Sequence, residues 1–172
     1  SRLGEGFYAF WPRTVVGSLR NGWALERRRF AIKGQHPWRP RNEVLNAWAV
    51  SVALYAGVAL WLGVGVLPYL ALQAVLGFTL LEVVNYVEHY GLLRARVGVA
   101  GFERWERVEP RHSWNANHIA TNVLLFNLQR HSDHHANPTR RYQALRHCPE
   151  APQLPTGYAG MILLALVPPL WR

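Results

Sequence analysis

The chain has 172 residues, of which 50% are hydrophobic and 17% charged, and its formal net charge is +9. This length suits one domain, and the composition is more apolar and less charged than that of an average soluble domain. The single cysteine, Cys148, excludes a disulfide framework and a cysteine-ligated zinc or iron–sulfur site. Basic chains bind nucleic acid, anionic lipid or acidic proteins, but no nucleic-acid-binding module is recognisable, so we expect no nucleic-acid partner.

Residues 1–43 carry nine of the 19 basic residues. Apolar side chains such as Leu19 and Trp23 alternate there with arginines such as Arg20 and Arg27. This pattern is typical of a helix that lies at the headgroup boundary of a membrane. We therefore expect an amphipathic juxtamembrane arm over residues 1–43.

The segment 44–81 contains no charged residue over 38 positions. One membrane-spanning helix needs about 20 apolar residues, so the run predicts two helices, with Gly63 and Pro68 near the turn. A buried hairpin in a soluble protein would need a large apolar shell, which the rest of the chain cannot supply. We expect a transmembrane hairpin over residues 44–90, with spans of about 44–66 and 68–90.

Basic residues flank the predicted hairpin on both sides, and its turn has none. The positive-inside rule then places residues 1–43 and the polar region 91–157 in the cytoplasm. The apolar segment 158–172 is short for a full span, and we expect an interfacial, re-entrant or truncated segment. Because the chain starts without Met and stops within this segment, we interpret it as one partial domain. The predicted fold class is an all-α integral-membrane bundle, incomplete, with a helical hairpin and a histidine-rich cytoplasmic cap.

Seven of the eight histidines follow residue 88. His131, His134 and His135 have the spacing i, i+3, i+4, which places three imidazoles on one face of a helix. Neutral imidazole is a ligand for iron, zinc, copper or nickel. Such clusters also occur as surface accidents or pH-sensitive patches, but Asp133 beside them, as a possible hydrogen-bond partner, favours a metal site.

His89 lies at the predicted cytoplasmic end of the second span, close to Glu82 and Glu88. Ionisable residues at this depth are costly and usually functional, although His89 could also snorkel and Glu82 could bond within the bundle. We expect His89 to join the cluster. Four imidazoles fill one zinc tetrahedron but cannot fully ligate two irons.

His112 and His118 are six residues apart, which is poor for joint ligation from one helix. We expect structural groups or hydrogen-bond partners of the metal ligands, because such partners surround most metal-binding histidines. Glu82, Glu88 and Asp133 are further candidates for this role.

Several segments closely resemble the membrane alkane monooxygenases. The segments are NYVEHYGL at 85–92, EPRHSWNANH at 109–118, LQRHSDHHANPTRRY at 128–142 and EAPQLPTGY at 150–158. The resemblance implies a six-helix, fatty-acid-desaturase-like membrane fold with two iron ions bound only by histidines. Of the four histidine boxes in that family, the last two carry over to His89 and to His131, His134 and His135. Boxes of the HExxHK and EHxxHH types are expected before Ser1, so the fragment alone is expected to be inactive.

The implied reaction is O₂-dependent hydroxylation of a medium- or long-chain alkane to a primary alcohol, with electrons from a rubredoxin and its reductase. The substrate would enter from the lipid bilayer, and the active site would face the cytoplasm at the inner membrane of a bacterium. Rubredoxins are small and acidic, so a basic surface suits docking. Arg130, Arg140 and Arg141 are candidates for this surface, with lipid headgroup contact or solvation as the alternative.

Two other functions stand as alternatives. A related membrane hydroxylase or desaturase, acting on a fatty acid or a xylene-like ring, would share the three-histidine boxes. A non-enzymatic metal-binding or transport protein should place polar ligands near the bilayer midplane. Residues 44–81 contain no histidine or acid, which counts against transport.

Overall fold

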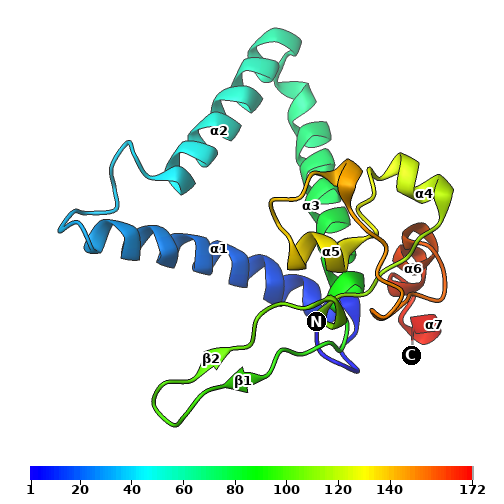
Figure 1. The fold of residues 1–172 in the computed structure, drawn as a ribbon. Coiled ribbons are helices and arrows are strands. Elements are labelled where there is room, and N and C mark those ends of the chain that lie inside the picture. The colour runs from blue at the N-terminus through cyan, green and yellow to red at the C-terminus, as the bar shows by residue number, and fades with distance from the viewer. Residues whose placement is uncertain (172) are drawn as a thin grey trace. The chain divides into compact units, whose positions relative to one another are not determined.

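The computed structural model describes residues 1–171 and is mostly helical (Figure 1). The chain divides into two compact units. One unit contains Ser1–Phe10 together with the chain from Leu81 onward, and the other contains Trp11–Leu80. The candidate site lies entirely in the first unit.

The unit Trp11–Leu80 contains parts of two helices and the whole of a third. It includes most of α1 (Phe7–Ala31), all of α2 (Glu43–Leu62) and the first part of α3 (Leu67–His89), with a 3-10 turn at Val64–Val66. Gly63 ends α2 at φ 89°, a left-handed conformation that glycine adopts without strain. The predicted helical hairpin is confirmed, with its turn between Gly63 and Val66.

Both helices of the hairpin are long and apolar enough to cross a membrane. Their apolar side chains are exposed, including Leu60 at 88% and Trp61 at 81%. Soluble proteins rarely leave large contiguous apolar surfaces in water. The hairpin therefore has the composition and the surface of a lipid-facing element.

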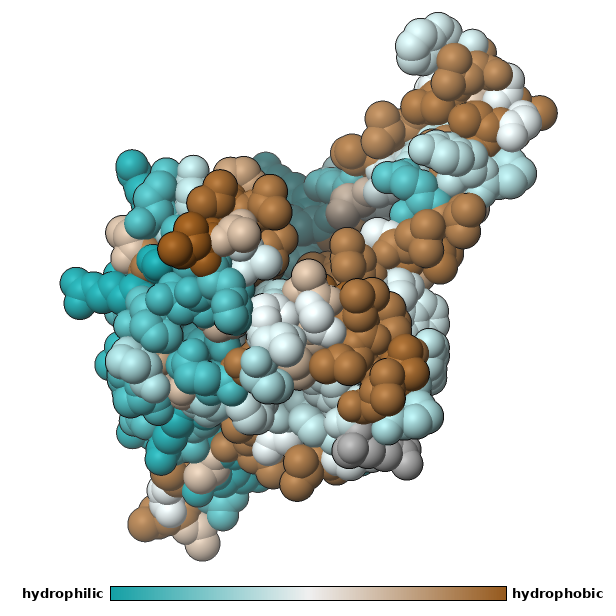
Figure 2. Space-filling model, turned by 90° about the vertical axis from the view of Figure 1, so that its right-hand side faces the viewer, coloured by the Kyte–Doolittle hydropathy of each residue, from teal (hydrophilic) through white to brown (hydrophobic). Residues whose placement is uncertain are grey.

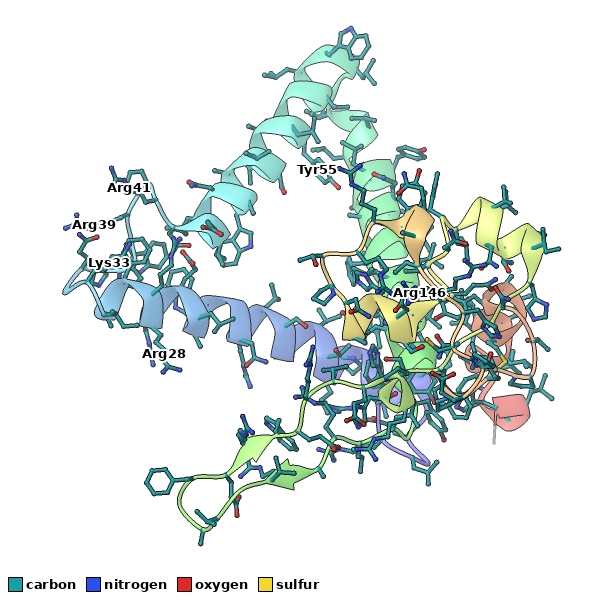
Figure 3. The ribbon with its side chains drawn as sticks, in the orientation of Figure 1. Arg28, Lys33, Arg39, Arg41, Tyr55 and Arg146 are labelled. Carbon is teal, nitrogen blue, oxygen red and sulfur yellow. The ribbon has the colours of Figure 1, made fainter. Side chains whose placement is uncertain are left out.

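Charged and polar contacts tie the end of α1 to the start of α2. Arg29 bonds Glu26 at 2.7 Å and Glu43 at 2.8 Å. The Asn42 side chain caps α2 by accepting hydrogen bonds from the backbone of Val44 and Leu45. Basic side chains gather around this connection, where Figure 3 labels Arg28, Lys33, Arg39 and Arg41.

The other unit surrounds the last turns of α3. Its elements are β1 (Arg96–Val97), β2 (Arg104–Trp105), a 3-10 turn at Pro110–His112, α4 (Ile119–Leu124), α5 (His131–Ala136), a 3-10 turn at Tyr142–Ala144, α6 (Tyr158–Ala165) and α7 (Pro168–Trp171). The two strands pair antiparallel, with Arg96 opposite Trp105. The sequence analysis did not predict this hairpin.

The first residues of the chain pack against the end of α3. The Tyr86 hydroxyl donates to the carbonyl of Glu5 at 2.5 Å, and the Tyr86 ring contacts those of Phe7 and Phe10. Residues 1–10 thus belong to the unit that contains the histidine cluster, whereas the rest of the predicted arm, from Trp11 on, belongs to the other unit.

A buried polar network fixes the start of α5. The Asn115 Oδ1 accepts hydrogen bonds from the backbone and hydroxyl of Ser132 at 2.9 and 2.7 Å. Gln129, fully buried, donates to the carbonyl of His118 and to the side chain of Asn122. Because buried polar groups need partners, these contacts hold the segment before α5 in one conformation.

The apolar segment after residue 157 forms two short helices, α6 and α7, in place of one long helix. One side of α6 is buried through Tyr158, Met161 and Ala165, while Leu163 and Leu170 are exposed. Figure 2 shows apolar side chains gathered on the face to which α4, α6 and α7 contribute. A surface of this kind is suited to lipid or to another protein segment.

Candidate metal centre

Three imidazoles from α3 and α5 converge at one point. One ring nitrogen of each of His89, His131 and His135 lies within 4.8 Å of the others. The Nε2 atoms of His89 and His135 are 3.3 Å apart, and the rings of His131 and His135 are 4.3 Å apart. His89 at the end of α3 and two histidines of α5, His131 and His135, thus come together. They are three of the four predicted ligands.

The orientation of the His89 ring is fixed by its own helix. The Nδ1 of His89 lies 3.1 Å from the carbonyl of Asn85, one turn earlier. Since a carbonyl can only accept, Nδ1 carries the proton and Nε2 presents a lone pair. That lone pair is directed toward the cluster, as a metal ligand requires.

His131 is the most enclosed member of the cluster. It is 6% exposed, and neither of its ring nitrogens makes a hydrogen bond within residues 1–171. Its Nε2 lies 3.1 Å from the Glu88 carboxylate, but without the direction of a hydrogen bond. A buried imidazole without partners is costly, and a bound cation would satisfy it. The donor set therefore fits a metal ion.

The charge state of the cluster suits metal binding. Burial, with smaller contributions from His135, His89 and His134, lowers the pKa of His131 to about 2. Burial, followed by His89 and His134, lowers the pKa of His135 to about 4. Both imidazoles are therefore neutral at pH 7, which is the form that ligates a metal.

His134 lies apart from the other three imidazoles. Its ring is exposed, at 5.8 Å from the ring of His131 and 5.6 Å from that of His135. It lies on the predicted helix but outside the group of three histidines whose ring nitrogens lie within 4.8 Å of one another. A fourth contact from His134 would need a change of side-chain rotamer or a second metal position.

The Asp133 side chain forms hydrogen bonds with the loop after α5 and not with the histidines. Its carboxylate accepts hydrogen bonds from Arg140, Asn137 and the backbone of Arg146. These contacts lower its pKa against the effect of burial. Asp133 thus anchors residues 137–146 to the helix that carries the ligands.

The other predicted partners of the ligands lie at different places. Glu82 accepts a hydrogen bond from the Asn85 side chain at 3.1 Å, and Asn85 in turn holds His89 through its carbonyl. His112 is buried between Glu106 and the backbone of Glu109. The ring of His118 is exposed.

Two of the three predicted docking arginines are engaged within the chain. Arg130 donates to the side chain of Asn117 and to the carbonyl of Leu145, and Arg140 pairs with Asp133. Arg141 is exposed. Of the three, Arg141 has the guanidinium most available to a partner.

A cavity of about 550 Å³ adjoins the imidazoles. Its walls are largely apolar, and His89 and His135 lie beside one another in its lining. The lining residues are His89, Leu92, Leu93, Arg94, Trp105, Val108, His112, Ser113 and His135. A cavity with apolar walls next to a metal site suits a hydrophobic substrate.

The sequence analysis missed the contribution of the β-hairpin to this cavity. Leu93, Arg94 and Trp105 come from its two arms. The only signals in the sequence were the glycines at 98 and 101 between short apolar runs, which indicate a turn between strands.

The chain is similar to known proteins over nearly its whole length. The fatty acid desaturase family model matches residues 2–165. Alkane 1-monooxygenase from Acinetobacter baylyi is 51% identical over 99% of this chain and 41% of its own length. Alkane 1-monooxygenase 2 from Pseudomonas aeruginosa is also 51% identical, over 100% of this chain and 45% of its own length. The resemblance predicted from the motifs is thereby confirmed.

A more distant relative is the hydroxylase component of a xylene/toluene monooxygenase from Pseudomonas putida. It is 31% identical over 98% of this chain and 43% of its own length. The chain thus spans less than half the length of each of these three relatives.

Proposed function

The chain belongs to the fatty acid desaturase family, and from this premise we propose that the whole protein hydroxylates alkanes at a histidine-ligated iron centre. The observation that carries the proposal is the convergence of three imidazoles from two helices beside an apolar cavity. The names of the alkane 1-monooxygenase relatives supply the substrate class.

The proposed ligands are His89, His131 and His135, with His134 as a fourth. Bound iron would supply the redox chemistry that O₂-dependent attack on an unactivated C–H bond needs, because such a bond offers no handle to an acid or base. The protein orients the ligands: Asn85 fixes the His89 ring, and burial keeps His131 and His135 neutral.

Two iron ions form the proposed cofactor. They need more donors than these four histidines provide, and we place the remaining ligands outside the 172 residues. Glu88 lies beside His131, and we propose that with metal bound its carboxylate accepts a hydrogen bond from the His131 ring nitrogen that does not contact the metal.

The substrate is proposed to be an alkane that reaches the site from the bilayer. The apolar wall formed by Leu92, Leu93 and Val108 accommodates an alkyl chain next to His89 and His135. These apolar side chains would also disfavour water beside the reacting carbon.

Electrons are proposed to come from a rubredoxin, reduced in turn by its reductase. The partner would approach the basic surface that includes Arg141, on the cytoplasmic face of a bacterial inner membrane. The net charge of +9 supports docking of an acidic protein.

The test is to express the full-length protein that contains this chain, measure bound metal, and assay octane and hexadecane with rubredoxin and reductase. Iron in the protein and 1-alkanol as the product are expected. Zinc in place of iron would overturn the oxygenase proposal. Oxidation of xylene in preference to both alkanes would assign the protein to the second candidate function, which the xylene/toluene relative suggests.

A further inference from the structure

The β-hairpin between α3 and the 3-10 turn at Pro110–His112 has an exposed apolar tip. All residues from 93 to 105 are exposed. Residues 97–102, the tip, read VGVAGF and carry no charge. Val99 is 72% and Phe102 82% exposed, values that are unusual for such side chains in water.

The tip is a formed turn. The Phe102 backbone donates to the carbonyl of Val99 at 2.9 Å. Gly98 has φ 126°, and a Cβ there would come within 2.6 Å of the Phe102 carbonyl oxygen. The turn therefore requires glycine at 98 and presents Phe102 at the end of the hairpin.

Arginines surround the tip on both strands. The arms contain Arg94, Arg96, Arg104 and Arg107, and the Arg96 guanidinium stacks on Trp105 at 5.0 Å. Two glutamates oppose these four arginines. Glu106 is turned toward Arg111 and His112, and Glu103 lies 3.4 Å from Arg96. The hairpin thus presents an excess of positive charge around an apolar end.

We propose that this hairpin docks on an anionic lipid surface, with its tip among the headgroups. Apolar tips surrounded by arginines and a tryptophan are the composition of interfacial membrane anchors, and anionic lipids attract nearby basic residues. The hairpin starts within a few residues of His89, where the second candidate span ends, so the lipid surface is within reach. Figure 1 shows it projecting from this end of α3. An acidic protein would use the arginines but leave the apolar tip in water.

Docking of the hairpin would also affect the cavity. Leu93, Arg94 and Trp105 belong to both the hairpin and the cavity wall. Lipid contact would bring this wall beside the leaflet in which an alkane dissolves. This step rests on the proposed function, whereas docking itself does not.

The experiment uses the full-length protein in which Cys148→Ser and the replacement of any other cysteine remove the native thiols. Phe102→Cys then adds one cysteine at the tip, which is labelled with an environment-sensitive fluorophore. The labelled protein is reconstituted in lipid nanodiscs. The matched control places the label at Gln143→Cys, an exposed position in the 3-10 turn at Tyr142–Ala144. Discs contain neutral lipid alone or with 30% anionic lipid, and headgroup-level spin-labelled lipids serve as quenchers. The readout is lipid contact, so it is independent of metal content and turnover.

We expect a blue-shifted emission at 102 in anionic discs, with at least about twofold more quenching by spin-labelled lipid than at 143. Raising the salt concentration, or Arg96→Gln with Arg104→Gln, should reduce the quenching. Equal solvent exposure of both labels in anionic discs would overturn the proposal. A blue-shifted emission at 102 without quenching by spin-labelled lipid would also overturn the proposal. So would a blue shift that appears only after an acidic soluble protein is added. Either result would assign the tip to a protein contact.

Discussion

The Nε2 atoms of His89 and His135 lie 3.3 Å apart, although 46 residues separate them in the chain. One comes from the end of a candidate membrane span and the other from a short helix in the polar region. Two imidazole nitrogens at this distance either share a proton or share an ion. The burial of His131 beside them, without hydrogen bonds from the described residues, favours an ion.

The first prediction separates the close histidines from His134. Replacing His89, His131 or His135 with Ala should lower bound iron at least about tenfold, because each removes a donor from the converging group. His134→Ala should lower it as well if a second iron position recruits this exposed ring. Metal analysis of the purified full-length variants measures this. Unchanged iron in His134→Ala would remove His134 from the ligand set and leave the other three.

The second prediction concerns Glu88. Its carboxylate lies 3.1 Å from His131 Nε2 and is 4% exposed. Glu88→Ala should weaken iron binding about 10- to 100-fold, because groups that orient metal ligands have effects of this size. Glu150→Ala, at an exposed position outside the cluster, is the matched control. A spectroscopic change of the iron centre in the Glu88 variant would distinguish orientation of a ligand from a general loss of folding.

Most of the fold could be predicted from local patterns. The uncharged run 44–81 and the glycine and proline in its middle predicted a hairpin that the structure places at 43–89. The spacing of His131 and His135 predicted a shared face, because helical periodicity depends only on neighbouring positions. Contacts between distant segments could not be predicted this way.

Asp133 shows why long-range contacts were missed. Its position between two histidines suggested a hydrogen bond to them, but its partners are Arg140 and the backbone of Arg146. The choice depends on how the loop 137–146 folds back, which periodicity does not encode. The same holds for the β-hairpin, whose four strand residues are too few to give an alternating pattern.

The third prediction concerns the contacts by which Asp133 holds Arg140 and the backbone of Arg146. Asp133→Asn should destabilise the protein by about 1.5–3 kcal/mol, the usual size of a hydrogen bond to a charged group. Thermal unfolding in detergent, with Arg140→Gln and the double variant, measures the coupling between the two residues. A loss of iron with unchanged stability would instead support direct contact between Asp133 and a histidine.

The fourth prediction concerns the pH dependence of the metal-free protein. The pKa values of His131 and His135 fall from 6.5 to about 2 and about 4, so the unfolded chain binds protons that the folded chain does not. Above pH 6.5 both imidazoles are neutral in the folded and the unfolded chain, so no stability is lost there; below it, stability is lost as the pH falls toward 4 for His135 and toward 2 for His131. The melting temperature should therefore decrease over this range. His131→Gln should flatten the decrease, and His147→Gln, in an exposed loop, should not.

The last prediction concerns partner docking. Arg141 is exposed, whereas Arg130 and Arg140 are held by contacts within the chain. Arg141→Gln should raise the KM for rubredoxin about two- to fivefold at low salt, as expected for an exposed charge at the rim of an interface. The difference should shrink as salt screens the charge. Arg130→Gln and Arg140→Gln should mainly lower thermal stability. If all three variants change KM equally while their stability is unchanged, the intramolecular contacts do not restrict the docking surface and the assignment to Arg141 is wrong.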